Sequence, residues 1–115
     1  AGEILTEAEV EKERKKIMEL FKDVEDDRKK KMIERKVKEM AFQAVAIREA
    51  KYSIMTEGLK TEVVNGSQRY MKENPAVATF DKYSRAYNSN IDKLIEYLPQ
   101  QQTEKISKLA AFRNA

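Results

Sequence analysis

The sequence predicts a mainly α-helical fold with one short β-hairpin, and three observations support that prediction. Charged residues make up 37% and hydrophobic residues 41% of the 115 residues, a composition typical of solvated amphipathic helices. Apolar side chains recur three and four residues apart along most of the chain, which is the spacing of one helix face. One Asn-Gly pair, Asn65-Gly66, lies between two short runs of strand-forming residues and indicates a tight hairpin turn.

The N-terminal helix is predicted from about Glu7 to Lys22. Thr6 and Glu9 form a Thr-x-x-Glu capping box, in which each side chain accepts a hydrogen bond from a free backbone N–H group. Apolar residues follow at helical spacing: Val10, Ile17, Leu20, Phe21 and Val24. The acidic segment 23–27 ends this helix, and Asp26 or Asp27 then caps the next one.

The second helix is predicted to be the dominant element, and it ends at Gly58, which we expect to be a left-handed C-cap. One face is nearly continuous over Ile33, Val37, Met40, Ala41, Ala44, Ile47, Lys51, Tyr52 and Met55. About 31 residues at 1.5 Å per residue give roughly 46 Å of helix. A compact chain of this size has a diameter of roughly 34 Å. The helix therefore either protrudes from its domain or is flanked by other subunits.

The hairpin is predicted over 60–73, with Asn65-Gly66 as the two central residues of a type I′ turn. An isolated hairpin is marginally stable, so we expect it to pack against another surface.

Asn74 and Pro75 are predicted to cap and begin the third helix, which Pro99 ends. Its apolar residues follow a heptad-like pattern: Val77, Phe80, Tyr83, Tyr87, Ile91, Leu94, Ile95 and Leu98. Its aromatic residues and Tyr97 are at core spacing, which favours packing over stacking on bases. Thr103 is predicted to cap a short last helix that carries Ile106, Leu109, Ala110 and Phe112.

The chain has no Cys, no His and no Trp, which excludes most kinds of catalytic site. There is no Cys/His zinc site, no Ser-His-Asp triad and no thiol nucleophile. The acidic segment 23–27 lacks the spacing of a calcium loop, and helix capping explains it better than cation binding. We expect no catalytic residue, no cofactor and no metal. An enzyme that uses carboxylates and a metal is the least favoured alternative.

Segment 28–38 carries the strongest chemical signal, because its seven basic residues against the single acid Glu34 give it a charge of +6, while the rest of the chain sums to −3. On a helical wheel, four of the basic residues form a stripe opposite the apolar face: Arg28, Lys31, Arg35 and Lys38. The stripe is flanked by Lys29, Lys30 and Lys36. The scarcity of acids four residues away favours a phosphate-binding surface over an ordinary solvated face, although both readings remain open. On the first helix, Lys12, Arg14, Lys15 and Lys16 lie among acids, which is typical of a solvated face.

The order of motifs resembles that of the small subunit of the phage terminase, a DNA-packaging component of tailed phages and prophages of Gram-positive bacteria. The resemblance covers about Leu5 to Pro99. The motifs are Met40-Ala-Phe42-Gln43, Glu62-Val-Val-Asn65-Gly66-Ser-Gln68, Lys72-Glu-Asn74-Pro-Ala76 and Leu94-Ile-Glu-Tyr-Leu98-Pro99.

The resemblance implies a non-catalytic factor that forms a homo-oligomeric ring, binds double-stranded viral DNA and presents it to the large subunit, which carries the ATPase and nuclease. It also implies a location in the cytoplasm of the bacterial host. The chain has no apolar run of the ~20 residues that span a bilayer, and we recognise no signal peptide. A helix-turn-helix with a short Gly-containing turn is not apparent, so we assign DNA contact to the basic stripe by its charge.

Oligomerisation is predicted from the long second helix, the heptad-like third helix and the unsupported hairpin. We expect the second and third helices to form an antiparallel pair at the wall of the ring. The predicted contact residues are Val37, Met40, Ala44, Ile47, Phe80, Tyr83, Tyr87, Ile91 and Leu94. The predicted units are 1–58 with the basic stripe, 59–99 completing the oligomerisation core, and 100–115 for docking to a partner.

The alternative function is that of a helical structural or adaptor protein that oligomerises and binds an acidic protein partner without DNA. In that case the basic stripe binds the partner or only faces water. Binding of heterologous duplex DNA at low salt distinguishes the two functions.

Overall fold

The computed structural model describes residues 3–99 and 102–114 and shows a mainly helical chain with one hairpin, as the sequence predicts. The helices are α1 (Glu7–Met18), α2 (Asp27–Glu57), α3 (Pro75–Ile95) and α4 (Thr103–Ala111). Two 3₁₀ turns follow α1 and α4, at Glu19–Phe21 and Phe112–Asn114. Strands β1 (Lys60–Asn65) and β2 (Gln68–Glu73) form the antiparallel hairpin between α2 and α3. Residues 100, 101 and 115 of the predicted C-terminal segment lie outside the described ranges.

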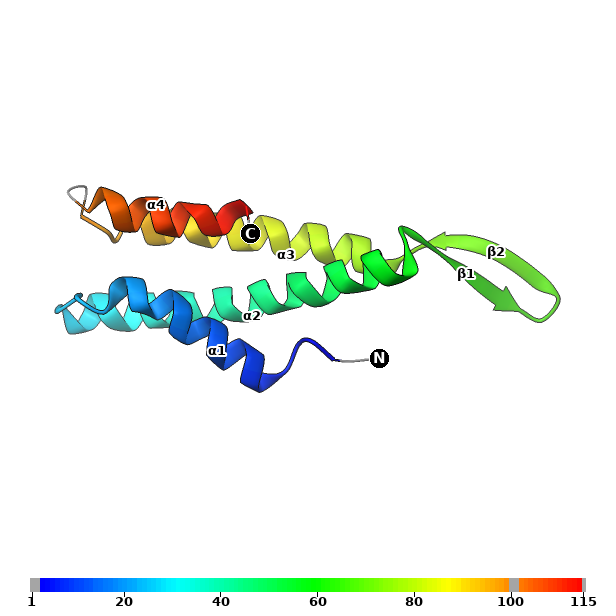
Figure 1. Cartoon of the computed structure of the whole chain (residues 1–115), viewed down its shortest axis with the longest axis horizontal. Coiled ribbons are helices and arrows are strands. Elements are labelled where there is room, and N and C mark those ends of the chain that lie inside the picture. Colours follow the sequence, from blue (N-terminus) through cyan, green and yellow to red (C-terminus); the bar gives the residue numbers. More distant parts are fainter. Residues whose placement is uncertain (1–2, 100–101, 115) are drawn as a thin grey trace.

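The molecule is elongated because α2 and α3 form a long antiparallel pair and the hairpin continues outward from one end (Figure 1). The chain measures 63 × 25 × 19 Å, with a radius of gyration of 17.7 Å. A compact chain of this length has a radius of gyration of about 13 Å. The shorter α1 and α4 lie along the half of this pair that is remote from the hairpin (Figure 1). The helix pair therefore has a covered half and an uncovered half.

The hydrophobic core lies in the covered half and receives side chains from every helix. Ile17 and Phe21 come from the α1 region, and Leu109 comes from α4. The remaining buried members are Ile33, Val37, Met40, Tyr87, Ile91, Leu94 and Leu98. One core thus holds the N-terminal and C-terminal parts together. The buried Leu109 shows that the apolar side of α4 packs on this chain, so a docking partner would meet the other side of that helix.

The starts of α1, α2 and α3 follow the sequence closely. Thr6 Oγ1 accepts a hydrogen bond from the Glu9 N–H, and Asp26 Oδ1 accepts one from the Lys29 N–H. Asn74 caps α3 through a hydrogen bond from the Ala76 N–H, and Pro75 is the first helical residue. Each cap satisfies a backbone donor that the helix itself leaves free.

Three local predictions need correction. Gly58 has φ 90° and ψ 177°, so it ends α2 in an extended conformation with positive φ and not in the left-handed helical one. Thr103 is the first residue of α4, and its N-cap is Gln102, whose side chain makes no capping hydrogen bond. α1 ends as an α-helix at Met18, and the 3₁₀ turn that follows places Phe21 in the core.

The hairpin turn is also displaced by one residue from its predicted position. Asn65 pairs with Gln68, which leaves Gly66 and Ser67 as the two loop residues. Gly66 has φ +63°. No described residue other than glycine has a positive φ, so φ of Ser67 is negative. Glycine at the first central position is the requirement of a type II′ turn, so the predicted type I′ turn at Asn65-Gly66 is wrong.

The predicted oligomerisation residues divide into two groups. Five of them are buried inside the single chain: Val37, Met40, Tyr87, Ile91 and Leu94. These five pack α2 against α3 within one chain, so they are corrected from contacts between subunits to core residues. The other four are half-buried: Ala44, Ile47, Phe80 and Tyr83.

Across the described residues, no helix is both long and apolar enough to span a membrane.

Candidate nucleic-acid interface

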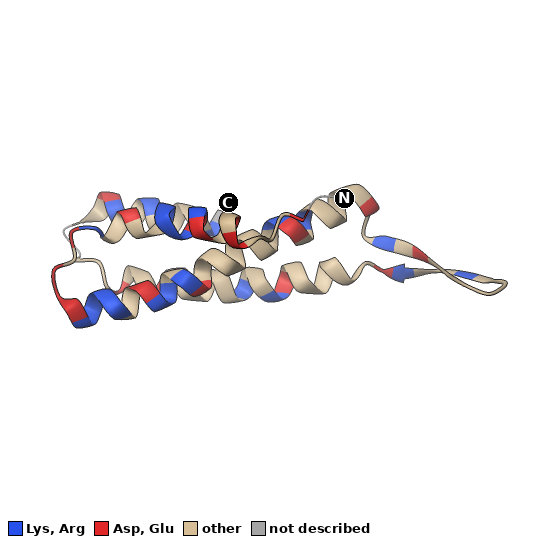
Figure 2. Cartoon of the chain, turned by 90° about the horizontal axis from the view of Figure 1, so that it is seen from below, with Lys and Arg blue, Asp and Glu red and all other residues tan. Residues whose placement is uncertain are grey.

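The basic stripe lies on the first three turns of α2, at the end of the molecule opposite the hairpin (Figure 2). Its members, Arg28, Lys31, Arg35 and Lys38, are exposed. Ile33 and Val37 are fully buried on the other side of the same turns. The arrangement follows from the 3.6-residue period, which separates the two sets of side chains across the helix.

No cation of segment 28–38 forms an ion pair with any acid in the described ranges. Glu34 is four residues from both Lys30 and Lys38, yet it pairs with neither. Elsewhere on the surface such pairs do form, as between Arg85 and Asp81. The exposed cations of the stripe are therefore available to an anionic partner.

α1 contributes a further cation that the sequence analysis assigned to a solvated face. Arg14 lines a groove of about 480 Å³ together with Lys31, Arg35 and Lys38, and the acids Glu11 and Glu34 lie in the same groove. Arg14 Nε donates a hydrogen bond to Glu11 Oε2 over 2.9 Å, and this bond is the main cause that lowers the pKa of Glu11. Arg14 is four residues after Val10 and three before Ile17. The helical period alone therefore places it on the packed side of α1, near the cations of α2.

The flanking lysines do not all belong to this groove. Lys29 is half-buried in a separate depression beside Val24, Tyr97 and Lys105. Lys30 is exposed and Lys36 is half-buried. Of the seven predicted residues, the four of the stripe thus lie along one side of α2. The three flanking lysines point in other directions around the helix.

An exposed aromatic residue extends the groove beyond its basic end. Phe42 lies one turn after Lys38 on the same side of α2 and is 40% exposed. With Leu5, Val10, Arg14 and Lys38 it lines an adjoining cavity of about 590 Å³. The sequence prediction did not include this residue. Its spacing of four residues from Lys38 could have placed it on the same side of α2 as the stripe. The groove therefore has a cationic part and an apolar part.

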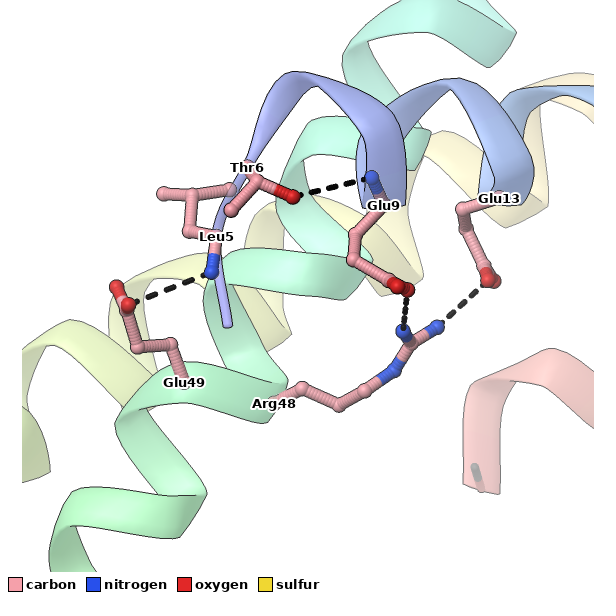
Figure 3. Close-up of polar contacts among 6 residues, drawn as sticks. All are labelled: Leu5, Thr6, Glu9, Glu13, Arg48 and Glu49. Carbon is pink, nitrogen blue, oxygen red and sulfur yellow. Dashed lines mark hydrogen bonds and ion pairs between the residues drawn. The ribbon is translucent and has the colours of Figure 1, made fainter. Parts of the chain in front are cut away.

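Polar contacts fix α1 across α2 and so set the position of Arg14 (Figure 3). Arg48 Nη2 donates to Glu13 Oε2 over 2.6 Å, and its Nη1 lies 3.9 Å from Glu9 Oε2. Glu49 Oε1 accepts hydrogen bonds from the backbone N–H groups of Ile4 and Leu5, over 3.2 and 3.3 Å. These contacts join the N-terminus to the middle of α2.

The acidic side chains are the candidates for binding a metal ion. Within the described ranges, no three Asp, Glu, His or Cys residues are grouped so that they would hold a metal ion. In the acidic segment, Asp26 caps α2 and Asp23 Oδ2 pairs with Lys105 Nζ over 2.9 Å.

Comparisons of the chain with models of protein families, with characterised proteins and with solved structures give no match. The interpretation of the basic groove therefore depends on its own residues and geometry.

Proposed function

We propose that the protein is a non-catalytic DNA-recognition and regulatory subunit of a phage DNA-packaging terminase. In this function a homo-oligomeric ring binds double-stranded viral DNA and presents it to the large ATPase and nuclease subunit. The observation that carries the DNA-binding part is the unpaired stripe of Arg28, Lys31, Arg35 and Lys38. The packaging part depends on the resemblance in the order of the sequence motifs.

The stripe suits a phosphate backbone for electrostatic reasons. Its four cations follow one side of α2, and none of them forms an ion pair with a described acid, although Glu11 and Glu34 lie in the same groove. Phosphate contacts release condensed counterions, which drives binding without sequence information. Arg14 adds a fourth cation to the groove, beside Lys31, Arg35 and Lys38, once its bond to Glu11 is exchanged for a phosphate.

The salt dependence of duplex binding tests the proposal. With four to seven phosphates neutralised per chain, we expect log affinity to fall against log salt with a slope of roughly −4 to −6. The double variant R35E/K38E reverses two stripe charges and should weaken binding by at least about tenfold and flatten the slope by about 2. Fluorescence anisotropy with a labelled duplex measures both quantities.

A matched control separates the site from the net charge. The variant K82E/K93E makes the same change in charge at two exposed positions of α3 and should lower the affinity much less. Equal losses in both variants, or an affinity independent of salt, would contradict the assignment to the stripe.

The second candidate function is that of a helical adaptor that oligomerises and binds an acidic protein partner. The apolar extension of the groove over Leu5, Val10 and Phe42 favours it, because an acidic amphipathic helix presents both charge and apolar surface. An affinity for an acidic amphipathic peptide that exceeds the affinity for duplex DNA at the same salt would favour this function over the first.

A further inference from the structure

A separate cavity of about 380 Å³ lies on the other side of α2, where α1 and the C-terminal 3₁₀ turn meet the long helix pair. Its volume is within the range of about 300–1,000 Å³ that is typical of small-molecule sites. Half-buried apolar side chains from three elements line it: Ile47 from α2, Phe80 from α3 and Phe112 from the 3₁₀ turn. It shares no lining residue with the basic groove.

The charge around this cavity is unbalanced. Four cations line it against the single carboxylate of Glu13. The Glu13 carboxylate is bonded to Arg48, and Arg113 pairs with Asp92. Lys16 and Lys51 remain, and neither forms an ion pair with another described residue. Both are exposed, so they stand at the rim with two uncompensated positive charges.

One of these lysines is held at the cavity by its neighbour. Lys16 Nζ lies 5.6 Å from the centre of the Phe112 ring, which is the geometry of a cation–π contact. The same ring forms part of the apolar wall. The positive charge of Lys16 and the apolar wall of the cavity therefore lie on either side of the Phe112 ring.

We propose that this cavity binds a small amphipathic anion, with an aromatic or aliphatic body against Ile47, Phe80 and Phe112 and its carboxylate or sulfonate at Lys16 and Lys51. The apolar walls supply the affinity through burial, and the lysines select the charge of the ligand. The proposal is independent of the DNA-binding function, because the two sites have no residue in common.

Fluorescence titration of the full chain with 8-anilinonaphthalene-1-sulfonate tests the proposal. We expect saturable binding of one dye per chain, with the uncharged analogue N-phenyl-1-naphthylamine bound about tenfold more weakly. The double variant K16E/K51E should weaken the anionic dye by at least about tenfold and leave the neutral dye unchanged. The matched variant K12E/K93E carries the same change in charge at exposed positions outside the cavity and should bind both dyes as the parent chain does.

Filling the cavity gives a second, independent measurement. Ser84 lines it from α3 and is half-buried, so S84F should abolish the binding of both dyes. A44F, which fills the cavity from α2, replaces this variant if circular dichroism shows that S84F does not fold. Absence of saturable binding, equal affinity for the charged and neutral dyes, equal losses in the two charge variants, or full binding by the filled variant would each overturn the proposal.

Discussion

At the scale of single residues, Arg48 joins two helices through unequal partners. Glu13 is only 8% exposed and receives the short hydrogen bond from Arg48, whereas Glu9 is more exposed and more distant. A carboxylate with little access to water depends on its partner, because water cannot replace the lost bond fully. The pair is therefore a structural contact between α1 and α2 and not merely a surface ion pair.

Replacing Arg48 by Ala should lower the free energy of unfolding by about 1–3 kcal/mol, because the nearly buried carboxyl group of Glu13 then loses its hydrogen-bond donor. R14A is the matched control, since it removes an arginine from the exposed Glu11, where water replaces the lost contact, and should cost much less. Urea denaturation at one protein concentration measures both. Equal losses would show that the burial of Glu13 has no energetic consequence.

Burial raises the pKa of Tyr87 to about 12, and the negative charge of Glu13 contributes in the same direction. The unfolded chain ionises this phenol near pH 10, so the raised value favours the folded state below about pH 10. That contribution is lost as the pH rises from about 10 to about 12. In Y87F the stability should fall less steeply over this interval, as measured by denaturation at several pH values. Parallel curves for the two proteins would refute the linkage.

At the scale of the elements, Asn74 joins the end of α2, the base of the hairpin and the start of α3. Its Oδ1 caps α3, while its Nδ2 donates to the Gly58 carbonyl over 3.0 Å and to Ser53 Oγ over 3.3 Å. Its backbone N–H donates to the Leu59 carbonyl over 2.8 Å. Because the side chain is almost fully buried, its donor and acceptor atoms both act on the geometry of this junction.

Two substitutions separate the capping role of Asn74 from its role in the junction. N74D keeps the acceptor that caps α3 and loses the donor to Gly58, so we expect a loss of about 1 kcal/mol. N74A loses both and should cost about 2 kcal/mol or more, since the cap alone contributes about 1 kcal/mol. Thermal unfolding followed by circular dichroism measures the order. An N74D variant as stable as the parent would show that the donor contributes nothing.

The starts of α2 and α3 were predictable from sequence because they depend on short-range chemistry. Asp26, Asn74 and Pro75 act on backbone groups within three residues of themselves. The hairpin was predictable for the same reason, but the exact turn was not, because either Asn65-Gly66 or Gly66-Ser67 satisfies the local rules. The strand register decides between them, and it depends on pairing across the whole ribbon.

The site was predictable only where it lies on a single helix. Counting charges in segment 28–38 identifies the stripe, and the helical period orients it. Arg14 and Phe42 join the groove through the packing of α1 against α2, which no short-range pattern encodes. Tyr52 and Met55 illustrate the same limit, because they continue the apolar stripe of α2 and are nevertheless exposed. Their burial depends on whether another element covers them.

At the scale of the whole molecule, the uncovered half exposes apolar side chains that the chain itself does not bury. Met55 is 78% and Leu59 65% exposed at the end of α2, and the hairpin adds Val64, Tyr70 and Met71. Exposed apolar groups concentrated in one region are typical of protein–protein contacts. The uncovered half is therefore the surface we expect to join the subunits of the proposed ring, in place of the buried residues of α2 and α3.

Light scattering coupled to size-exclusion chromatography should show an assembly heavier than the 13.4 kDa chain at micromolar concentration. M55E should lower the measured mass, because a charge then lies in the contact between subunits. M32E makes the same change at a 54% exposed methionine near the opposite end of α2 and should leave the mass unchanged. A monomeric parent chain, or equal effects of the two variants, would exclude this surface as the contact.

The unequal cover of α2 also implies a gradient of local opening along one uninterrupted helix. Backbone amides around Val37 and Met40 lie over the core, so we expect them to exchange with solvent only through global unfolding. Among the described helices only α3 lies beside the amides near Ile54, so we expect fraying that starts at the hairpin to reach them first. In the free chain we therefore expect the covered half to be the more protected part of α2. Hydrogen exchange should slow in the uncovered half alone when a neighbouring subunit binds there.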